Sequence, residues 1–501
     1  MYFIDPQKHA RRAFLRRASA LSLSTTALPF ALNLAALGEA SAFDATGYKA
    51  LVCVFLYGGN DYANTVMAYD VPSYDAYFGV RGIGPTQIGT SIAIPKASLT
   101  ATLLMPNAAP QVHLNTAIPD RQYALHPSMT GMAKLFNNGK AAVQLNVGPL
   151  VAPLTKAQYL SANRKVNPIP PKLFSHNDQQ STWQALSTEG ARTGWGGRFA
   201  DLMAGMNGGN TLFTAISTAG NAVFLSGQSI VQYQLSTGTQ PAVVITGQQG
   251  NSLFGSSLAP SRVRDLITDT NLTNNFAADY STLVARSLSA ATNVNTAFTQ
   301  GIVTGIQTAP AYTNPITTQV ETNSLALQLQ TVARMIAAAP GLGVRRQVFF
   351  VSLGGWDTHD FQNTTQSNLL AKVAHAFAYF DGALANVGGL DRRAQVTTFT
   401  ASDFSRTITT NGDGTDHAWG GHHFIMGGAV KGQDIYGQFP TIGPDVGGFN
   451  NPDNITGFQI PTTSVDQYGA TLGRWFGASE SELDVIFPRL GGFQSRNLGF
   501  L

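Results

Sequence analysis

Four short segments rich in apolar and β-branched residues constrain the fold of this chain more than any other feature of its sequence. They span residues 51–56, 141–147, 347–353 and 395–400, and each is followed by turn-forming residues. Such segments suit strands that are buried on both faces, as in a parallel sheet covered by helices. Between some of them, apolar side chains recur at helical spacing, as in residues 325–336 and 370–384. Alternating strands and helices predict an α/β fold.

One region differs from the rest of the chain in amino-acid composition. From about residue 205 to 315, Asn, Gln, Ser, Thr and Gly dominate, and residues 266–299 look helical. We predict an inserted accessory region here. It either covers the functional edge of the sheet or is surface elaboration without a role.

The first 42 residues are predicted to be a twin-arginine signal peptide. Residues 11–17 read Arg-Arg-Ala-Phe-Leu-Arg-Arg, a mildly apolar stretch follows, and residues 40–42 offer an Ala-Ser-Ala cleavage site. The alternative is a basic amphipathic helix or a membrane anchor, but polar residues and a proline interrupt the apolar stretch. We therefore expect the twin-arginine translocase as a partner during export, a periplasmic or secreted protein, and no stable membrane span in the mature chain.

The charge balance argues against nucleic acid as a partner. The full chain has 31 Lys+Arg and 28 Asp+Glu, and the signal peptide holds five of the first and two of the second, so the mature chain has 26 of each. No basic stripe with interleaved aromatic residues is present. A single cysteine, Cys53, excludes an intramolecular disulfide and is expected to be buried within its apolar segment.

Carboxylates and an imidazole follow three of the predicted strands. Asp61 follows the first, Asp357 and His359 follow the third, and Asp403 follows the fourth. In open α/β sheets ligands bind beyond the carboxyl ends of the strands, so these residues are expected to converge. Asp357 and His359, at i and i+2, can point to the same side and bind one ion. The alternatives are a helix cap at Asp357 and a plain turn at Asp61.

A second cluster lies on a glycine-rich loop. Asp416 and His417 are adjacent, and two further histidines follow, of which we select His422. Nearby glycines let such a loop curl so that its ligands converge. Nitrogen and oxygen donors together suit a divalent metal, with zinc favoured and calcium, magnesium or manganese as alternatives. A flexible surface loop is the competing interpretation.

Two residues are candidates for catalysis. Arg406 offers a planar fork to a bound oxyanion, or else forms a salt bridge with an acidic residue. Ser175 precedes what looks like a helix, where the helix dipole would favour attack on an anionic ester, but a helix N-cap is the simpler alternative. The sequence lacks a Gly-x-Ser-x-Gly elbow, a Walker loop, a Gly-x-Gly-x-x-Gly motif after the first strand and a Cys-x-x-Cys pair. These absences disfavour a serine hydrolase, an NTPase and a dinucleotide enzyme.

Several motifs, in order, resemble one bacterial family. They are Leu-Tyr-Gly-Gly-Asn-Asp (56–61), Leu-His-Pro-Ser-Met (125–129), Ser-His-Asn-Asp-Gln-Gln (175–180), Thr-Gly-Trp-Gly-Gly-Arg (193–198), Leu-Gly-Gly-Trp-Asp-Thr-His (353–359), Gly-Thr-Asp-His (414–417) and Pro-Thr-Thr-Ser-Val-Asp-Gln-Tyr (461–468). The chain resembles the domain-of-unknown-function 1501 family from about residue 48 to 501. That family is similar in turn to the alkaline phosphatase and sulfatase superfamily.

This resemblance implies a three-layer α/β/α sandwich with one or two metals at the strand ends. Asp61, Asp357, His359 and Asp403 match the superfamily's ligand positions, and His417 or His422 stands in for an imidazole that Phe404 replaces. No Cys or Ser lies in a Cys/Ser-x-Pro-x-Arg setting, so a formylglycine sulfatase is not expected. The sequence therefore predicts an exported metal-dependent hydrolase of phosphate or sulfate esters, whose partner is a small-molecule or polymer-linked anionic ester. The alternative is a non-catalytic, metal-containing pseudoenzyme or binding protein on the same fold.

Overall fold

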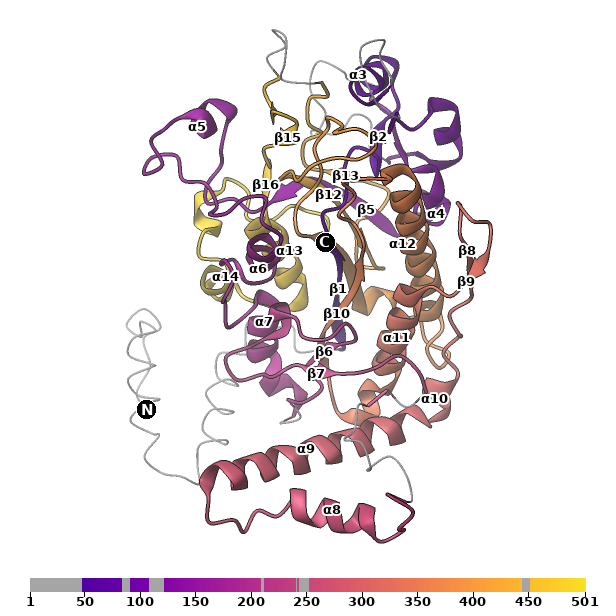
Figure 1. Ribbon diagram of the computed structural model, residues 1–501, viewed down its shortest axis with the longest axis vertical. Helices are drawn as coiled ribbons and strands as arrows, with labels where there is room; N and C mark the ends of the chain where they lie inside the picture. Colours follow the sequence, from indigo (N-terminus) through magenta and orange to yellow (C-terminus); the bar gives the residue numbers. More distant parts are fainter. Residues whose placement is uncertain are drawn as a thin grey trace, which may run out of the picture. The chain divides into compact units, whose positions relative to one another are not determined.

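A computed structural model describes residues 47–82, 91–107, 121–208, 211–239, 241–242, 252–443 and 451–501. The predicted signal peptide lies outside the described residues. Figure 1 shows the arrangement of the elements along the chain.

The central sheet has the strand order β13-β5-β12-β11-β1-β10-β6-β7, with β16 also paired to β5. These strands are β1 (Lys49–Tyr57), β5 (Ala141–Gly148), β6 (Ala215–Ser217), β7 (Tyr233–Gln234), β10 (Arg346–Gly354), β11 (Val396–Ser402), β12 (Gly421–Met426), β13 (Ile435–Tyr436) and β16 (Thr463–Ser464). Within this sheet the pairs that β12 forms with β11 and β5 are antiparallel, and the others are parallel. The predicted α/β class is thus confirmed, and the four predicted strands are β1, β5, β10 and β11.

Strand β1 lies at the centre of the sheet, and its burial accounts for its apolar sequence. It pairs in parallel with β10 on one side and β11 on the other, and its interior residues are buried. Val52 and Val54 belong to the same hydrophobic cluster as the helices of one layer. Phe55 points the other way, and its ring centroid lies 5.9 Å from that of Phe350. A strand covered on both faces has no polar alternation, as its sequence shows.

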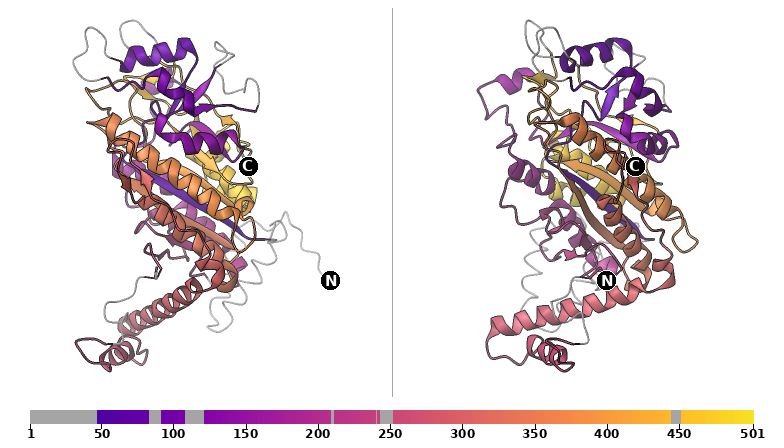
Figure 2. Two further views of the ribbon diagram at one scale, coloured as in Figure 1. Left: turned by 90° about the vertical axis from the view of Figure 1, so that its right-hand side faces the viewer. Right: turned by 45° about the vertical axis from the view of Figure 1, so that its right-hand side comes forward.

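Helices cover both faces of the sheet (Figures 1 and 2). On one face are α4 (Thr130–Asn137), α11 (Ser324–Leu342) and α12 (Gln362–Ala385); on the other are α6 (His176–Ala185), α7 (Trp195–Met203) and α13 (Val465–Phe476). The two predicted helical faces correspond to α11 and α12. Helix α11 begins at a side-chain cap from Asn323 and ends at Gly343, whose φ of 68° provides a left-handed C-cap.

The region set apart by composition has two parts. Strands β6 and β7 join the central sheet, whereas α8 (Ala259–Ile267) and α9 (Asn275–Phe298) lie side by side, followed by α10 (Gly301–Thr304). Smaller elements are β2 (Val66–Ala68), α3 (Val71–Arg81), β3 (Leu103–Leu104), β4 (Tyr123–Leu125), α5 (Lys156–Leu160), β8 (Tyr312–Thr313), β9 (Val320–Glu321), β14 (Asn454–Ile455), β15 (Phe458–Gln459) and α14 (Glu480–Ile486). None of the described helices combines the length and apolarity needed to cross a membrane.

Candidate metal centre

The segments that follow β1, β10 and β11 approach one another closely at one edge of the sheet. This follows from topology, because β1 pairs in parallel with both neighbours and all three carboxyl ends meet. Glycine is required where the backbones touch. A Cβ at Gly58, whose φ is 121°, would collide with the backbone of Asp357, and one at Gly414 would collide with the carbonyl of His359.

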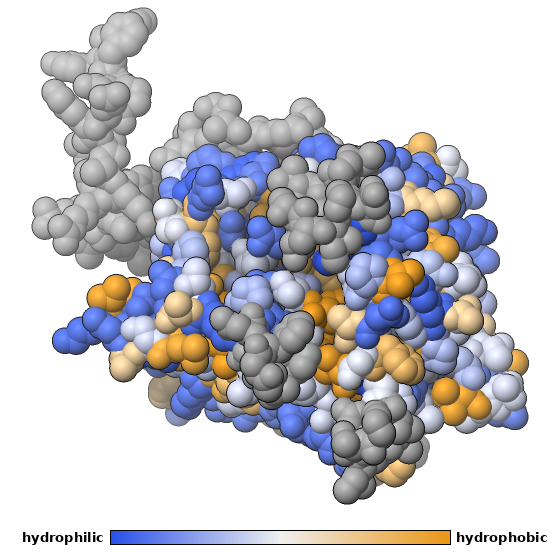
Figure 3. Space-filling model, turned by 90° about the horizontal axis from the view of Figure 1, so that it is seen from above, coloured by the Kyte–Doolittle hydropathy of each residue, from blue (hydrophilic) through white to orange (hydrophobic). Residues whose placement is uncertain are grey.

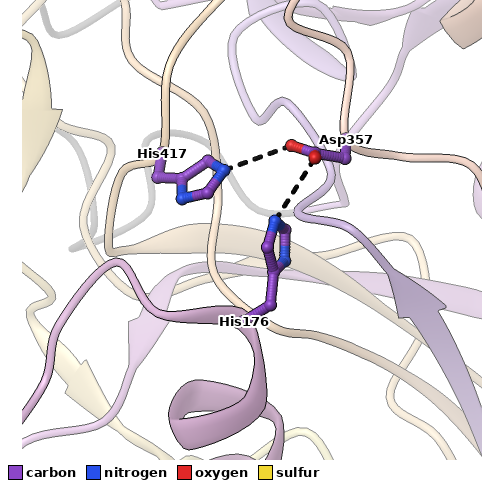
Figure 4. A group of neighbouring side chains, drawn as sticks. All are labelled: His176, Asp357 and His417. Atoms are coloured by element: carbon purple, nitrogen blue, oxygen red, sulfur yellow. Dashed lines mark hydrogen bonds and ion pairs between the residues drawn. The ribbon is translucent and has the colours of Figure 1, made fainter.

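Three side chains from three distant segments converge at this edge (Figure 4). His176 is the first residue of α6, Asp357 follows β10, and His417 lies in the loop before β12. Nε2 of His417 lies 3.2 Å from Oδ1 of Asp357, and Nε2 of His176 lies 3.4 Å from its Oδ2. One potential ligand atom from each residue lies within 4.8 Å of the others. Two imidazoles and a carboxylate so arranged form a group that can hold a metal ion.

His359 extends this group toward solvent. Its Nε2 lies 3.0 Å from Nε2 of His417 and 3.2 Å from Oδ1 of Asp357. The side chain of His359 is 41% exposed, whereas that of His417 is 23% exposed. We call His176, Asp357, His359 and His417 the rim cluster.

Each imidazole of the rim cluster is held through its Nδ1 atom. The partners are Oδ2 of Asp403 for His176 at 2.7 Å, the carbonyl oxygen of Phe174 for His417 at 2.7 Å, and Oδ1 of Asp416 for His359 at 3.2 Å. An oxygen acceptor at Nδ1 fixes the proton there and leaves the lone pair of Nε2 available. In the tautomer that carries its proton on Nδ1, each of these imidazoles presents the lone pair of Nε2 on the side of Asp357.

Asp403 lies behind His176 and is fully buried. Its Oδ2 also accepts a hydrogen bond from Nε2 of Gln180 at 2.8 Å, one turn further along α6. Its Oδ1 has no hydrogen-bond partner among the described residues. The hydrogen bond to Asp403 raises the pKa of His176 above its ordinary value. Asp403, predicted as a metal ligand, is thus placed where it anchors a ligand.

Arg406 holds the carboxylate of Asp357. Its Nη1 donates to Oδ1 of Asp357 at 2.6 Å and to the carbonyl of Gly58 at 3.3 Å, and its Nη2 donates to the carbonyl of Thr415. Burial alone would raise the pKa of Asp357, but the hydrogen bond and the charge of Arg406 outweigh it and lower that pKa. The carboxylate is therefore ionised at neutral pH.

Burial lowers the pKa of His417, so its imidazole is neutral at the same pH. An ionised carboxylate beside a neutral imidazole is the protonation state that metal binding requires.

Asp61, a predicted ligand, lies in a separate buried network. Its Oδ2 accepts from Nη1 of Arg81 at 2.5 Å and from Nε2 of Gln362 at 2.6 Å, and its Oδ1 accepts from Nη2 of Arg81 at 2.9 Å. Both Asp61 and Arg81 are fully buried. The carboxylate is thus already satisfied by a guanidinium, which leaves little reason for it to recruit a cation.

His422 lies on β12, apart from the rim cluster. Its Nδ1 accepts a hydrogen bond from the backbone amide of Asn146 at 3.0 Å, and its ring packs edge-on against Tyr62. Burial lowers its pKa to about 3, so it is a neutral interior residue. Because successive residues of a strand face opposite sides, His422 and His423 also diverge from each other.

Ser175 is the N-cap residue of α6, and its Oγ donates a hydrogen bond to Oδ2 of Asp178 at 2.9 Å. Of the predicted site residues, the structure therefore brings Asp357, His359 and His417 together. Asp416 and Arg406 contact His359 and Asp357, respectively, Asp403 contacts His176, and Asp61 and His422 lie apart from this cluster.

Sequence reasoning did not select His176 as a candidate ligand. The signal was available, because His176 follows Ser175 inside a motif that opens a helix. Its distance of more than 180 positions from Asp357 hid the contact.

Comparison with known proteins gives a family and distant matches among solved structures. The family model described as "Protein of unknown function (DUF1501)" matches residues 48–487. No curated protein matches the chain significantly. Among solved structures, the crystal structure of Ps i-CgsB in complex with k-i-k-neocarrahexaose matches with 8% identity and a TM-score of 0.32, covering 88% of this chain and 76% of that one. At that TM-score the match adds nothing to the strand order described above.

Proposed function

We propose that this chain, which belongs to the DUF1501 family, is a metal-dependent hydrolase of phosphate or sulfate esters. The observation that supports this most is the rim cluster, in which three Nε2 atoms, each anchored through Nδ1, face one ionised carboxylate. The motif resemblance to a superfamily of ester hydrolases supports the choice of reaction.

The donor atoms suit a cation in both chemistry and spacing. Neither Nε2 of His359 nor Nε2 of His417 carries a proton when Nδ1 is the donor, yet the two lie 3.0 Å apart. Two lone pairs that close repel each other unless a shared proton or a metal cation lies between them, and the rim cluster can accommodate either. Ligands bound at about 2.0–2.1 Å in a tetrahedral shell are about 3.4 Å apart, close to the 3.0–3.4 Å separations of the rim cluster. Nitrogen donors favour zinc over calcium or magnesium.

His176, Asp357 and His417 would hold the metal, and His359 would bind beside them at the exposed side. A divalent cation at this position supplies Lewis-acid chemistry by polarising an ester oxygen. The remaining residues maintain the donors: Asp403 keeps the proton of His176 on Nδ1, and Arg406 keeps Asp357 ionised. Ser175 remains the candidate nucleophile, with Asp178 orienting its hydroxyl.

The first test is metal content. Mature protein purified without chelators is expected to carry about one ion per chain by elemental mass spectrometry, and an Asp357→Ala, His417→Ala double variant less than about a tenth of that. The matched control is Asp279→Ala, His375→Gln, which changes the same residue types elsewhere and should retain the metal. Turnover of para-nitrophenyl phosphate and para-nitrophenyl sulfate should fall with the metal. Wild-type protein free of metal would remove the main support for a hydrolase.

A second candidate is a metal-containing pseudoenzyme or binding protein. Arg406 is fully buried and engaged by Asp357, Gly58 and Thr415, so its geometry supports holding Asp357 and does not support contact with a substrate oxyanion. The hydroxyl of Ser175 is likewise paired. Bound metal without turnover of any ester would favour this candidate. Unchanged turnover in Ser175→Ala would exclude Ser175 as the nucleophile without contradicting the proposal that the chain is a hydrolase.

We further propose export to the periplasm or beyond by the twin-arginine route. Residues 11–17 and the Ala-Ser-Ala sequence at 40–42 support it. Cell fractionation should find the mature protein outside the cytoplasm, and an Arg11→Lys, Arg12→Lys, Arg16→Lys, Arg17→Lys variant inside it. Identical fractionation of the two would contradict this route.

A further inference from the structure

The segment that leads into the rim cluster carries an unbalanced positive charge. Residues 151–175, which we call the basic segment, contain Lys156, Arg164, Lys165 and Lys172 and neither Asp nor Glu. Residues 43–501 contain equal numbers of basic and acidic residues, so the part of this stretch outside the basic segment has a net negative charge. A local excess of one sign raises the concentration of opposite charges around it.

Two charges of the basic segment, those of Arg164 and Lys165, are exposed, whereas Lys156 is half-buried and donates to the carbonyl oxygen of Asn451 at 2.8 Å. Arg164 is exposed, and its guanidinium lies 5.4 Å from the ring of Tyr159, which packs edge-on against Phe458 at 5.5 Å. Lys165 is exposed, and the side chain of Lys172 is 65% exposed, with its Nζ 3.4 Å from Asp178. Seen from above, the left edge, where Figure 1 places α5, shows hydrophilic side chains with hydrophobic ones between them (Figure 3).

The basic segment is physically joined to the rim cluster. Its Phe174 accepts the hydrogen bond from Nδ1 of His417, and the next two residues are Ser175 and His176. Lys172 and Phe174 adopt left-handed backbone angles, with φ of 50° and 72°. Such angles cost about 1 kcal/mol or more for residues other than glycine, and surrounding contacts must hold them. The segment's end is therefore fixed relative to the metal ligands.

We propose that the basic segment binds additional anionic groups of the ester substrate, so that the substrate is a chain of linked anionic units. This rests on the proposed function and names its substrate class. Lys165 lies eleven positions before His176, so their Cα atoms are at most about 40 Å apart. A single small ester would occupy only the rim cluster, whereas an oligomeric anion reaches both. An anionic membrane is the competing partner, since Leu160 and Val166 are exposed nearby, but continuity with His176 favours the substrate.

The test measures equilibrium binding of fluorescent dextran sulfate to the metal-loaded mature protein at about 50 mM and about 300 mM salt. Arg164→Gln, Lys165→Gln removes two exposed charges from the basic segment. The matched control, Arg262→Gln, Arg264→Gln, removes two exposed charges from α8. At low salt we expect about fivefold weaker binding for the first pair and less than about twofold for the second, with the difference shrinking at high salt.

Each outcome of this experiment either supports or contradicts the proposal. Equal weakening by both pairs would mean that only net charge matters and would overturn the proposal. Unchanged dextran sulfate binding with lost binding to phosphatidylglycerol vesicles would assign the segment to membranes and would also overturn it. Binding through the segment in a wild type that hydrolyses no ester would refute the proposed function alone. If esters are hydrolysed, the first pair should raise KM for sulfated oligomers about fivefold and leave kcat and the KM of para-nitrophenyl sulfate unchanged.

Discussion

The rim cluster and the buried interior use the same residue types with opposite consequences. Asp61 follows β1 as Asp357 follows β10, and the last residues of these strands, Tyr57 and Gly354, are partners in the sheet. Asp61 is enclosed with Arg81, and His422 is buried on β12, whereas Asp357 is 44% exposed and faces the Nε2 atoms of three histidines. We call Asp61, Arg81 and His422 the interior group. The comparison teaches that spare donor capacity, and not residue type, distinguishes the candidate metal site from the buried network.

The largest effect should come from the ion pair of the interior group. Arg81→Met leaves the carboxylate of Asp61 buried without its counter-ion, and we expect the free energy of unfolding to fall by about 3–5 kcal/mol. Urea unfolding of metal-free protein measures it. Asp61→Leu combined with Arg81→Met should recover part of the loss. His359→Ala, at the exposed side of the rim cluster, should cost less than about 1 kcal/mol. Similar losses for Arg81→Met and His359→Ala would abolish the distinction between the regions.

Metal content should separate the histidines of the two regions. His417→Ala removes a donor that faces Asp357, so the affinity for zinc should fall at least about 100-fold. His422→Gln keeps an acceptor for the amide of Asn146 and should leave the affinity unchanged. Competition with a fluorescent chelator measures both. If His422→Gln loses metal as His417→Ala does, the metal lies elsewhere than we place it.

Substitution of Asp403 tests whether the residues that contact Nδ1 of the rim-cluster histidines contribute to metal affinity, as the candidate ligands do. Asp403→Asn keeps the side chain's shape but removes the charge behind His176, and we expect about 10–100-fold weaker metal binding. Asp416→Asn is the matched control, because Asp416 is 62% exposed and anchors the more exposed His359. Its effect should be several-fold smaller. The reverse order of the two effects would make His359, and not His176, the principal ligand.

The smallest effect should be a change in pH dependence. Burial lowers the folded-state pKa of His422 to about 3, from 6.5 in the unfolded chain. The unfolded state therefore takes up a proton as the pH falls below 6.5 while the folded state does not, so stability decreases from there toward pH 3. In His422→Gln the decrease between pH 6 and 5 should be smaller by up to about 1.4 kcal/mol. Urea unfolding of metal-free protein at each pH measures it, and identical slopes would place His422 in contact with water.

Much of this fold was predictable because its signals are local. The apolar segments at 51–56 and 347–353 become β1 and β10, and apolar spacing over 370–384 becomes α12. The strand-end rule drew attention to Asp357 and His359, and the glycine-rich loop drew attention to His417; the structure brings the three together. The strand-end rule drew attention equally to Asp61, because it predicts that a residue lies at the edge of the sheet but does not predict its hydrogen-bond partners. The partner of Asp61 is Arg81, at the end of α3, and no spacing in the sequence reveals that pair.

The sequence by itself determined the α/β class, the positions of β1, β5, β10 and β11 along the chain and its membership of the DUF1501 family. Each of these depends on short motifs and on periodicity, which neighbouring residues set. Only the tertiary structure decided which donors share a space. His176 meets Asp357 across 181 positions, and Phe174 supplies a backbone carbonyl that carries no sequence signature. Such contacts are fixed by how helices pack on the sheet, so the free Nε2 atoms of the rim cluster, which define the candidate site, exist only in the folded chain.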